Sequence, residues 1–398
     1  MEMSELTALL TPEGLRLLDA LGAVETTDAA ARAVSTLRAA GHGPDLVAAV
    51  VGQAHLRARA RTKFGEFASR MLFTRAGLEQ ATRLSVAARH AGRLRTAGIT
   101  HVADLGCGIG GDSLAFAGAG LRVTAVDADE ITAALTAFNL APFGDDATVL
   151  HSTAETADLT GIDAVWLDPA RRTAGHSETR RVAATDYSPS LDWAFDLATR
   201  MPVGIKLGPG HDRDQLPAES EAQWVSVDGS VVELVLWSGA LARPGVHRAA
   251  MVVRGEHTHE LTAPADSEDA PVRELGAFLH EPDGAVIRAR LIGDVARHLE
   301  AGMLDEHIAY LTSDAALTSP FVQSFRVREV LPVTPKAISA ALRAGEIGTL
   351  EIKKRGVDID PAAFRKKLTL RGPNAATLIL ARVGSKRHAI LADRVGTA

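Results

Sequence analysis

Apolar side chains in the first 95 residues recur with the period of an α-helix. The stretch LRLLDAL at 15–21 places its leucines on one helical face, and similar spacing continues past residue 80. The stretch TPE at 11–13 predicts a helix start, because proline is tolerated in the first turn. GHGP at 41–44 predicts a break between two helices. The pattern therefore predicts a helical domain over residues 1–95.

From about residue 100 the pattern changes to short β-type apolar runs that alternate with helical stretches. Such alternation predicts βαβ units and an α/β fold with a parallel, doubly wound sheet. Only Asp228-Gly229-Ser230 joins the last two runs, so we expect a hairpin there. The prediction is a Rossmann-like, seven-stranded domain over residues 96–250. Its runs are HVADLG (101–106), LRVTAVD (121–127), ATVLHS (147–152), IDAVWLD (162–168), PVGIKLG (202–208), QWVSV (223–227) and VVELVLW (231–237).

Two smaller α/β units are expected after a proline- and acid-rich link near 262–271. The first, over 270–325, has β-type runs AVIRARL (285–291) and AYLTS (309–313) and a helix near 294–301. The second, over 326–398, has helices over 335–344 and near 361–367. Its β-type runs are VREVLPV (327–333), TLEIKKRG (349–356), TLILARVG (377–384) and HAILAD (388–393).

The charge of the chain is unevenly distributed. The net charge is −6, yet residues 326–398 carry 15 Lys and Arg against 6 Asp and Glu, a net of +9. Residues 1–325 therefore carry −15. An acidic body with a basic appendage suggests a polyanionic partner, although a solvated charged surface would look the same.

Several classes of protein are disfavoured. No run reaches the roughly 18 apolar residues of a membrane helix, and the acidic start MEMSELTALL does not resemble a signal peptide. The single cysteine, Cys107, allows no internal disulfide and fits a reducing compartment. GEHTHE (255–260) places two histidines on one strand face without further ligands. We expect a cytoplasmic protein with no membrane partner and no metal.

The first β-type run leads into a glycine-rich loop, DLGCGIGG at 104–111. Glycines at 106, 108 and 110 let the backbone turn out of the strand and approach a ligand at the start of the next helix. Glycines at 106, 108 and 111 also satisfy the dinucleotide pattern. Asp127 ends the second run, where its carboxylate can accept hydrogen bonds from ribose hydroxyls. These residues fit either NAD or S-adenosylmethionine.

The stretch AVWLDPARR at 164–172 distinguishes the two cofactors. Because proline cannot continue a central strand, Asp168-Pro169 must stand at the carboxyl end of the sheet, on the same edge as the glycine loop. A carboxylate there can hold the N–H groups of a nitrogen that attacks a methyl group, whereas a dehydrogenase has no evident use for it. Cys107 lies inside the loop, which disfavours a cysteine nucleophile. The pattern favours methyl transfer to nitrogen.

DLGCGIGGDS resembles motif I of class I S-adenosylmethionine-dependent methyltransferases, and LDPARR resembles the Asp-Pro motif IV of amino-methylating enzymes. Four further stretches are similar to bacterial methyltransferases with a C-terminal THUMP-like domain. They are GLEQATR (77–83), DYSPSLDW (186–193), EPDGAVIRA (281–289) and LEIKKRGVDIDPAAFRKKLTLRG (350–372). The resemblance implies S-adenosylmethionine as cofactor, RNA (tRNA or rRNA) as substrate, and ferredoxin-like and THUMP-like C-terminal modules.

The candidate residues fall into three groups. The catalytic candidates are Asp168, Pro169 and Arg171. The cofactor candidates are Asp104, Gly106, Gly108, Gly110, Asp127, Ala128, Thr153, Ala154 and Asp168. The RNA candidates are Arg171, Arg172, Lys353, Lys354, Arg355, Arg365, Lys366 and Lys367, and Arg180 and Arg181 also border the expected pocket.

The sequence departs from the family pattern at two points. Ala170 and Arg171 stand where an aromatic residue commonly stacks on the target base, and the guanidinium of Arg171 could stack instead. Thr153, with Glu155 nearby, stands where an acid usually contacts adenine. The sequence leaves the role of Tyr187 open. The alternative functions are a non-catalytic protein that binds S-adenosylmethionine and RNA, a methyltransferase of a small molecule, and an NAD-dependent oxidoreductase.

Overall fold

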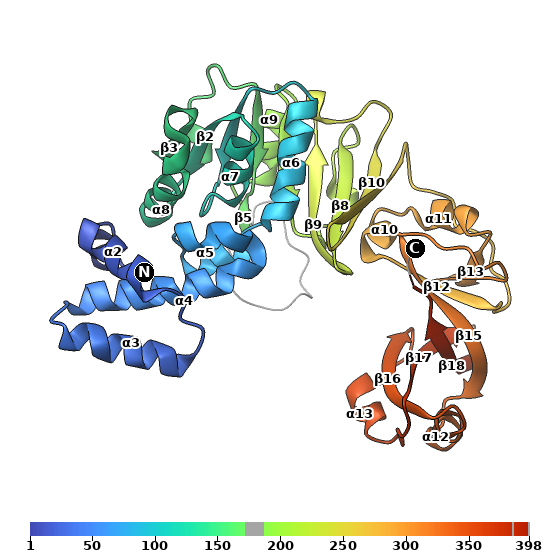
Figure 1. Ribbon diagram of the computed structural model, residues 1–398. Helices are drawn as coiled ribbons and strands as arrows, with labels where there is room; N and C mark the ends of the chain where they lie inside the picture. Colours follow the sequence, from blue (N-terminus) through green and yellow to red (C-terminus); the bar gives the residue numbers. More distant parts are fainter. Residues whose placement is uncertain (172–186, 384–385, 397–398) are drawn as a thin grey trace. The chain divides into compact units, whose positions relative to one another are not determined.

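The computed structural model describes residues 1–171, 187–383 and 386–396 (Figure 1). The chain forms two compact units. The first comprises Met1–Leu207 and Leu236–Ala242, and the second comprises Gly208–Val235 and Arg243–Ala398. In the described part of the chain, no helix has both the length and the apolar character needed to cross a membrane.

The first unit begins with helices, as the sequence predicts. Thr11 caps α2 by accepting a hydrogen bond from the Gly14 N–H, and the break at 41–44 separates α3 from α4. A buried apolar cluster joins these helices to α8 of the α/β part, with Leu18, Val50 and Leu135 among its members. The helices are α1 (Met3–Leu9), α2 (Pro12–Leu21), α3 (Thr27–Ala39), α4 (Pro44–Phe64), the 3-10 helix η1 (Gly65–Arg70), α5 (Arg75–Gln80) and α6 (Leu84–Thr96).

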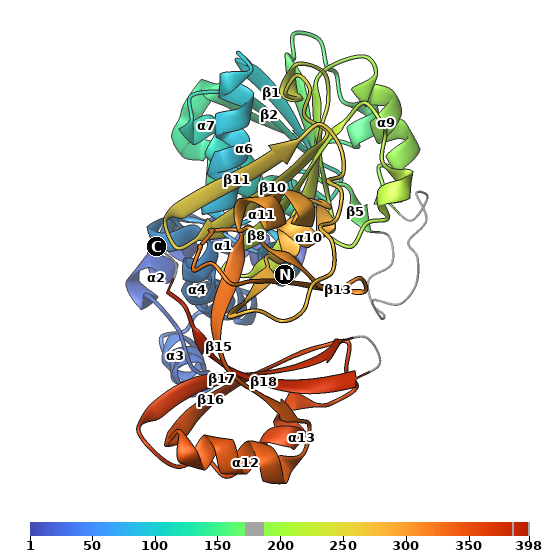
Figure 2. The ribbon, with the colours of Figure 1, turned by 90° about the vertical axis from the view of Figure 1, so that its right-hand side faces the viewer.

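Five parallel strands follow in the first unit, in the order β7-β4-β1-β2-β3. Figure 2 shows α6 and α7 on one side of strands β1 and β2 and α9 on the other, which is the layering of a doubly wound sheet. The strands are β1 (His101–Leu105), β2 (Arg122–Asp127), β3 (Ala147–His151), β4 (Ala164–Leu167) and β7 (Val203–Leu207). The remaining elements are α7 (Gly111–Gly118), α8 (Glu130–Leu140), η2 (Ala141–Asp146), η3 (Ala154–Thr156), β5 (Ala170–Arg171), β6 (Tyr187–Ser188), α9 (Leu191–Ala198) and η6 (Gly239–Leu241).

The other two predicted strands, β8 (Glu221–Val227) and β9 (Ser230–Trp237), are neighbours in the sheet. The residues that join them, Asp228 and Gly229, both have positive φ (49° and 83°), as a tight hairpin turn requires. All seven predicted runs are therefore strands, and the α/β fold is confirmed. Two strands that the sequence did not predict, β10 (Arg248–Arg254) and β11 (His257–Ala263), follow, and β10 pairs with β8 in parallel.

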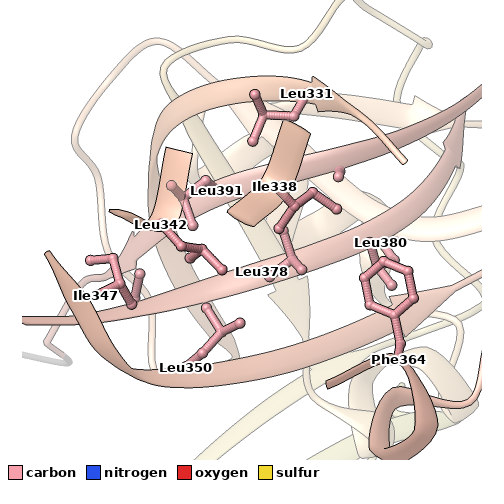
Figure 3. Close-up of a cluster of buried hydrophobic side chains, with 11 residues drawn as sticks. Leu331, Ile338, Leu342, Ile347, Leu350, Phe364, Leu378, Leu380 and Leu391 are labelled. Carbon is pink, nitrogen blue, oxygen red and sulfur yellow. The ribbon is translucent and has the colours of Figure 1, made fainter. Parts of the chain in front are cut away.

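A second sheet of the second unit has the order β13-β14-β12-β15-β18-β17-β16. Figure 3 shows Ile338 and Leu342 of α12 among Leu378, Leu391 and other buried side chains of this sheet. The strands are β12 (Phe278–Pro282), β13 (Gly302–Asp305), β14 (Ile308–Ser313), β15 (Val322–Pro332), β16 (Ile347–Arg355), β17 (Asn374–Val383) and β18 (Lys386–Arg394). The helices are η5 (Arg213–Gln215), α10 (Gly284–Arg288), α11 (Ile292–His298), α12 (Pro335–Ala344) and α13 (Pro361–Arg365).

The predicted β-type run over 285–291 is wrong. Most of it forms α10, because the Asp283 side chain accepts a hydrogen bond from the Ala285 N–H and starts a helix. Buried Ala285, Val286 and Ala289 then give this short helix an apolar face. The expected domain boundaries stay predictions. The structure adds that β15 continues across residues 325 and 326 and so joins the two C-terminal units in one sheet.

Candidate active site

The strand register brings four polar or glycine positions to one edge of the sheet. In neighbouring strands Leu105 pairs with both Val126 and Leu167, and Leu167 pairs with Ile205. The next residue of each strand is therefore Gly106, Asp127, Asp168 or Lys206. Because the strands are parallel, these residues all lie at the carboxyl edge, where open α/β sheets bind ligands.

The glycine loop leaves β1 in a conformation that needs glycine. Gly106 and Gly108 have φ of 85° and 56°. A Cβ on Gly106 would lie 2.9 Å from the carbonyl oxygen of Asp168, which is closer than real Cβ atoms approach. A Cβ on Gly108 would meet nothing within 4 Å, so the loop has open space above its backbone. The predicted Gly110 is the N-cap of α7.

Asp127 lies directly under this loop. Its Oδ2 accepts a hydrogen bond of 2.9 Å from the Gly108 N–H, and its Oδ1 accepts one of 2.9 Å from the Asp129 N–H. Partial burial raises the pKa of the Asp127 carboxyl, and the two N–H groups oppose that shift. Each carboxylate oxygen retains a second lone pair for a ligand hydroxyl.

The end of β3 lies beside Asp127. The Ser152 N–H donates to the Asp127 carbonyl oxygen at 3.0 Å, so Thr153 and Ala154 follow at the same edge. Thr153 Oγ1 is 3.0 Å from Thr156 Oγ1, and Ala154 is buried. Ala128 is exposed, and its carbonyl oxygen is 3.2 Å from Nε2 of His151.

Asp104 is buried under the loop rather than exposed to it. Only 1% of its surface is accessible, and its Oδ2 accepts a hydrogen bond of 2.5 Å from Ser113 of α7. Burial, followed by the charge of Asp112, raises the pKa of Asp104 to about 8. The folded protein therefore holds this carboxyl protonated at neutral pH, and the side chain ties β1 to α7.

Asp112, in the first turn of α7, is also buried but stays ionised. Burial opposes its ionisation, but the hydrogen bond and charge of His90 hold the pKa of Asp112 below its usual value. Its Oδ1 is 2.8 Å from His90 Nδ1, and its Oδ2 accepts a hydrogen bond from Thr82 Oγ1 at 2.8 Å.

The Asp168 carboxylate forms an ion pair with Lys206. Lys206 Nζ is 2.5 Å from Asp168 Oδ2 and 3.0 Å from Thr82 Oγ1. The Asp168 side chain is 38% exposed, whereas Lys206 is 13% exposed, so the carboxylate faces outward from a largely buried ammonium. The bonds from Lys206 through Thr82 reach Asp112 and His90, and the His90 ring lies 4.4 Å from the ring of Trp166 in β4.

Proline ends β4 as expected. The Asp168 N–H donates to the Leu105 carbonyl at 3.3 Å, and buried Pro169 has no N–H to continue the ladder. The chain then pairs Arg171 with Tyr187 across β5 and β6. Tyr187 is 2% exposed and packs inside the protein. Its strand partner Arg171 is one of the two residues that stand where the family commonly has an aromatic residue. The predicted Arg172, Arg180 and Arg181 lie outside the described residues.

Comparisons with known proteins agree with this geometry. The chain is 34% identical over 343 residues to an uncharacterized S-adenosylmethionine-dependent methyltransferase of Mycobacterium tuberculosis, and the match covers 83% of this chain and 91% of that protein. The chain belongs to the S-adenosylmethionine-dependent methyltransferases. S-adenosylmethionine is its cofactor, and the NAD alternative is set aside.

Two further comparisons concern the fold and the domains of the methyltransferase. A crystal structure from Porphyromonas gingivalis, classed as a methyltransferase, is 20% identical and superposes with a TM-score of 0.70 over 89% of this chain and 92% of that chain. A family model described as THUMP domain-like matches residues 322–394, which confirms the THUMP-like C-terminal part. A model for a domain of unknown function matches residues 2–60.

The carboxyl edge of the methyltransferase fits its cofactor. The open space over Gly108 and the hydrogen-bonded carboxylate of Asp127 can receive an adenosine ribose. The Asp168 side chain is 38% exposed, and the backbone carbonyl oxygen of Asp168 lies beside Gly106. The thiol of Cys107 is buried, and burial followed by the charges of Asp104 and Asp127 raises its pKa, so it is a poor nucleophile.

The basic candidates of the C-terminal part lie in different surroundings. Lys353 and Arg355 lie on one face of β16 and pair with Glu281, Lys353 Nζ at 2.6 Å and Arg355 at 4.0 Å. Lys354 alternates to the other face and is exposed. Arg365 donates to the Leu350 carbonyl, and Lys366 and Lys367 are exposed after α13. The six residues therefore do not form one free basic face.

Lys206 is the functional candidate that the sequence reasoning missed. The sequence pattern predicts the strand PVGIKLG at 202–208 but assigns no role to its lysine. The available signal is one charged residue in an otherwise apolar strand. It lies next to the last residue of the strand, and this position aligns with Asp168 at the carboxyl edge. Thr82, His90 and Asp112 gave no comparable signal, since only tertiary packing brings them together.

We expect Asp104→Asn to change the pH dependence of stability. The carboxyl has a pKa of about 8 in the folded protein against 3.8 as its ordinary value, so the folded state binds more protons between these pH values. The free energy of unfolding of the wild type then falls as pH rises through this window, by up to about 1.4 kcal/mol per pH unit. The asparagine variant lacks this slope. Chemical denaturation from pH 5 to pH 8, with exposed Asp145→Asn as the control, measures it; parallel profiles for wild type and Asp104→Asn would contradict the assignment.

Proposed function

We propose that this methyltransferase transfers a methyl group to a nitrogen of an RNA base. The observation that carries the proposal is the outward-facing carboxylate of Asp168, which stands at the carboxyl end of β4 beside the glycine loop. A nitrogen nucleophile needs its N–H groups held so that its lone pair points at the methyl carbon, and a carboxylate is an acceptor suited to that task. A second acceptor, the Asp168 carbonyl oxygen, lies against Gly106.

The cofactor-binding residues are assigned by position. Asp127 binds the ribose hydroxyls, the backbone of Gly106, Gly108 and Gly110 admits the cofactor, and Ala128, Thr153 and Ala154 line the side of the adenine. Asp104 acts from below by fixing β1 to α7 through Ser113. Bound S-adenosylmethionine supplies a methyl carbon that is electrophilic because it is attached to a sulfonium.

The chain's own residues then orient the reaction. The target nitrogen donates its lone pair to the methyl carbon as the carbon–sulfur bond breaks, and the electron pair of that bond stays on sulfur. Asp168 holds an N–H of the nucleophile, and after transfer the methylated nitrogen releases one proton to solvent water. Lys206 keeps the carboxylate oriented, since its ammonium occupies Oδ2 and is itself held by Thr82. Pro169 ends the strand, so that Asp168 can turn outward.

Two observations support RNA as the substrate. The THUMP-like match at 322–394 resembles a class of RNA-binding modules, and residues 326–398 carry a net charge of +9. Arg171, whose side chain lies outside the described part of the structure, stays the predicted candidate for stacking on the base or for holding a phosphate. We further propose a cytoplasmic location, with which the free Cys107 is compatible.

We expect Asp127→Ala to weaken cofactor binding. The substitution removes both acceptor oxygens under the glycine loop, so the dissociation constant for S-adenosylmethionine should rise on the order of 10- to 100-fold. Isothermal titration calorimetry measures it. Exposed Asp145→Ala should bind as the wild type does, and equal affinity of Asp127→Ala would remove Asp127 from the site.

We expect Asp168→Ala to abolish most methyl transfer while leaving cofactor affinity within about threefold. Labelled methyl from S-adenosylmethionine is offered to RNA, DNA, protein and small-molecule fractions of cells that lack this enzyme, and labelled RNA is digested to nucleosides. Label on a base nitrogen, lost with Asp168→Ala and kept with Asp145→Ala, supports the proposal. Label in another fraction, or on oxygen or carbon, refutes the substrate class.

We expect Lys206→Met to lower kcat about 10- to 100-fold with a smaller change in KM for RNA, because the ion pair orients Asp168 without touching substrate. Lys206→Arg keeps a cation at this position and should recover part of the rate. A variant whose thermal stability falls while its kcat stays near wild type would show that Lys206 acts on folding alone.

A further inference from the structure

The surroundings of the site concentrate positive charge from one part of the sequence. Residues 57–95 carry 10 Lys and Arg against 2 Glu, a net of +8, in a chain whose net charge is −6. The first 325 residues contain only two lysines, Lys63 and Lys206. Lys206 pairs with Asp168, and Lys63 belongs to the +8 segment itself.

Hydrogen bonds connect these cations to the carboxyl edge of the sheet. Lys63 Nζ donates to the carbonyl oxygens of Leu78, Glu79 and Ala81, each at 2.8 Å, and so holds the end of α5 against α4. Arg83 donates to the Thr62 carbonyl at 3.3 Å. The residue between them, Thr82, contacts Lys206, whose Nζ contacts Asp168.

Two arginines of this region, Arg59 and Arg83, have exposed side chains. Arg59 is 44% exposed and lies 3.9 Å from Glu79, its one ion-pair partner among the described residues, and Arg83 is exposed. An exposed ion pair of that length contributes little binding energy, so Glu79 does not neutralise the positive charge of this region. Burial, and then repulsion from Arg83 and Lys206, lowers the pKa of Lys63, while Glu79 opposes the shift. Gathering like charges in this way is unfavourable in the free protein.

We propose that Arg59 and Arg83 form a phosphate-binding surface that holds the RNA backbone next to the target nucleotide. Guanidinium groups match the geometry of phosphate oxygens, and a polyanion would relieve the repulsion among the cations. Lys63 does not contact the phosphate itself, since its three N–H donors already bind backbone carbonyls. It adds positive charge to the surface and holds α5 in place. The inference rests on RNA being the substrate. The proposed surface assigns a function to the end of the helical domain. Arg59 lies within residues 2–60, which match a family model for a domain of unknown function.

The test compares the double variant Arg59→Gln/Arg83→Gln with the matched control Arg32→Gln/Arg38→Gln. The control removes two exposed arginines from α3 of the same helical domain. The probes are a mixed-sequence single-stranded RNA oligomer, measured by fluorescence anisotropy over a range of salt concentrations, and total RNA from cells lacking the enzyme, measured by methyl transfer.

The double variant should bind the oligomer on the order of tenfold more weakly. Its plot of log affinity against log salt should be shallower by ~0.7 for each lost phosphate contact. KM for total RNA should rise, and S-adenosylmethionine affinity should stay unchanged. If wild-type and control proteins methylate RNA and the double variant matches them in affinity and salt slope, this surface is refuted and the proposed function stands. If the wild type neither binds nor methylates RNA, both fail.

Discussion

The ion pair between Asp168 and Lys206 is the interaction on which the site depends. It forms because β4 and β7 are parallel and in register, so that each strand delivers its next side chain to the same edge. A carboxylate held in this way cannot rotate freely, and it reaches solvent on the side away from the ammonium. The buried chain of Thr82, Asp112 and His90 behind the lysine then connects the edge to α6 and α7.

The helical domain supports the cofactor loop as well as covering the sheet. Asn139 of α8 donates to the carbonyl oxygens of Leu72 and Ile109, at 3.0 and 2.9 Å, and so joins the stretch after η1 to the glycine loop. A Cβ on Gly77 would lie 2.5 Å from Ile109, so α5 packs directly on that loop. Movement of these helices would therefore disturb the glycine loop.

The sequence predicted the parallel sheet, the hairpin after β8 and the edge that carries Gly106, Asp127 and Asp168, because period-2 apolar runs and Asp-Pro and glycine signals are local. It failed over 285–291, where one capping aspartate converts an apolar run into a helix. It also missed Lys206 and the buried bonds behind it. Those contacts join residues more than 20 positions apart, and no local pattern encodes them.

Strand β9 has a consequence for how the chain can be divided. Its first residues belong to the second unit, while Leu236 and Trp237 belong to the first. Trp237 lies 5.6 Å from Trp166, and Arg93 donates to the Leu241 carbonyl, so the return of the chain completes the core behind β4. No single cleavage of the backbone can therefore release an intact catalytic unit. A gene fragment that ends at residue 207 would lack part of its own core, so the two units must be inherited and expressed together.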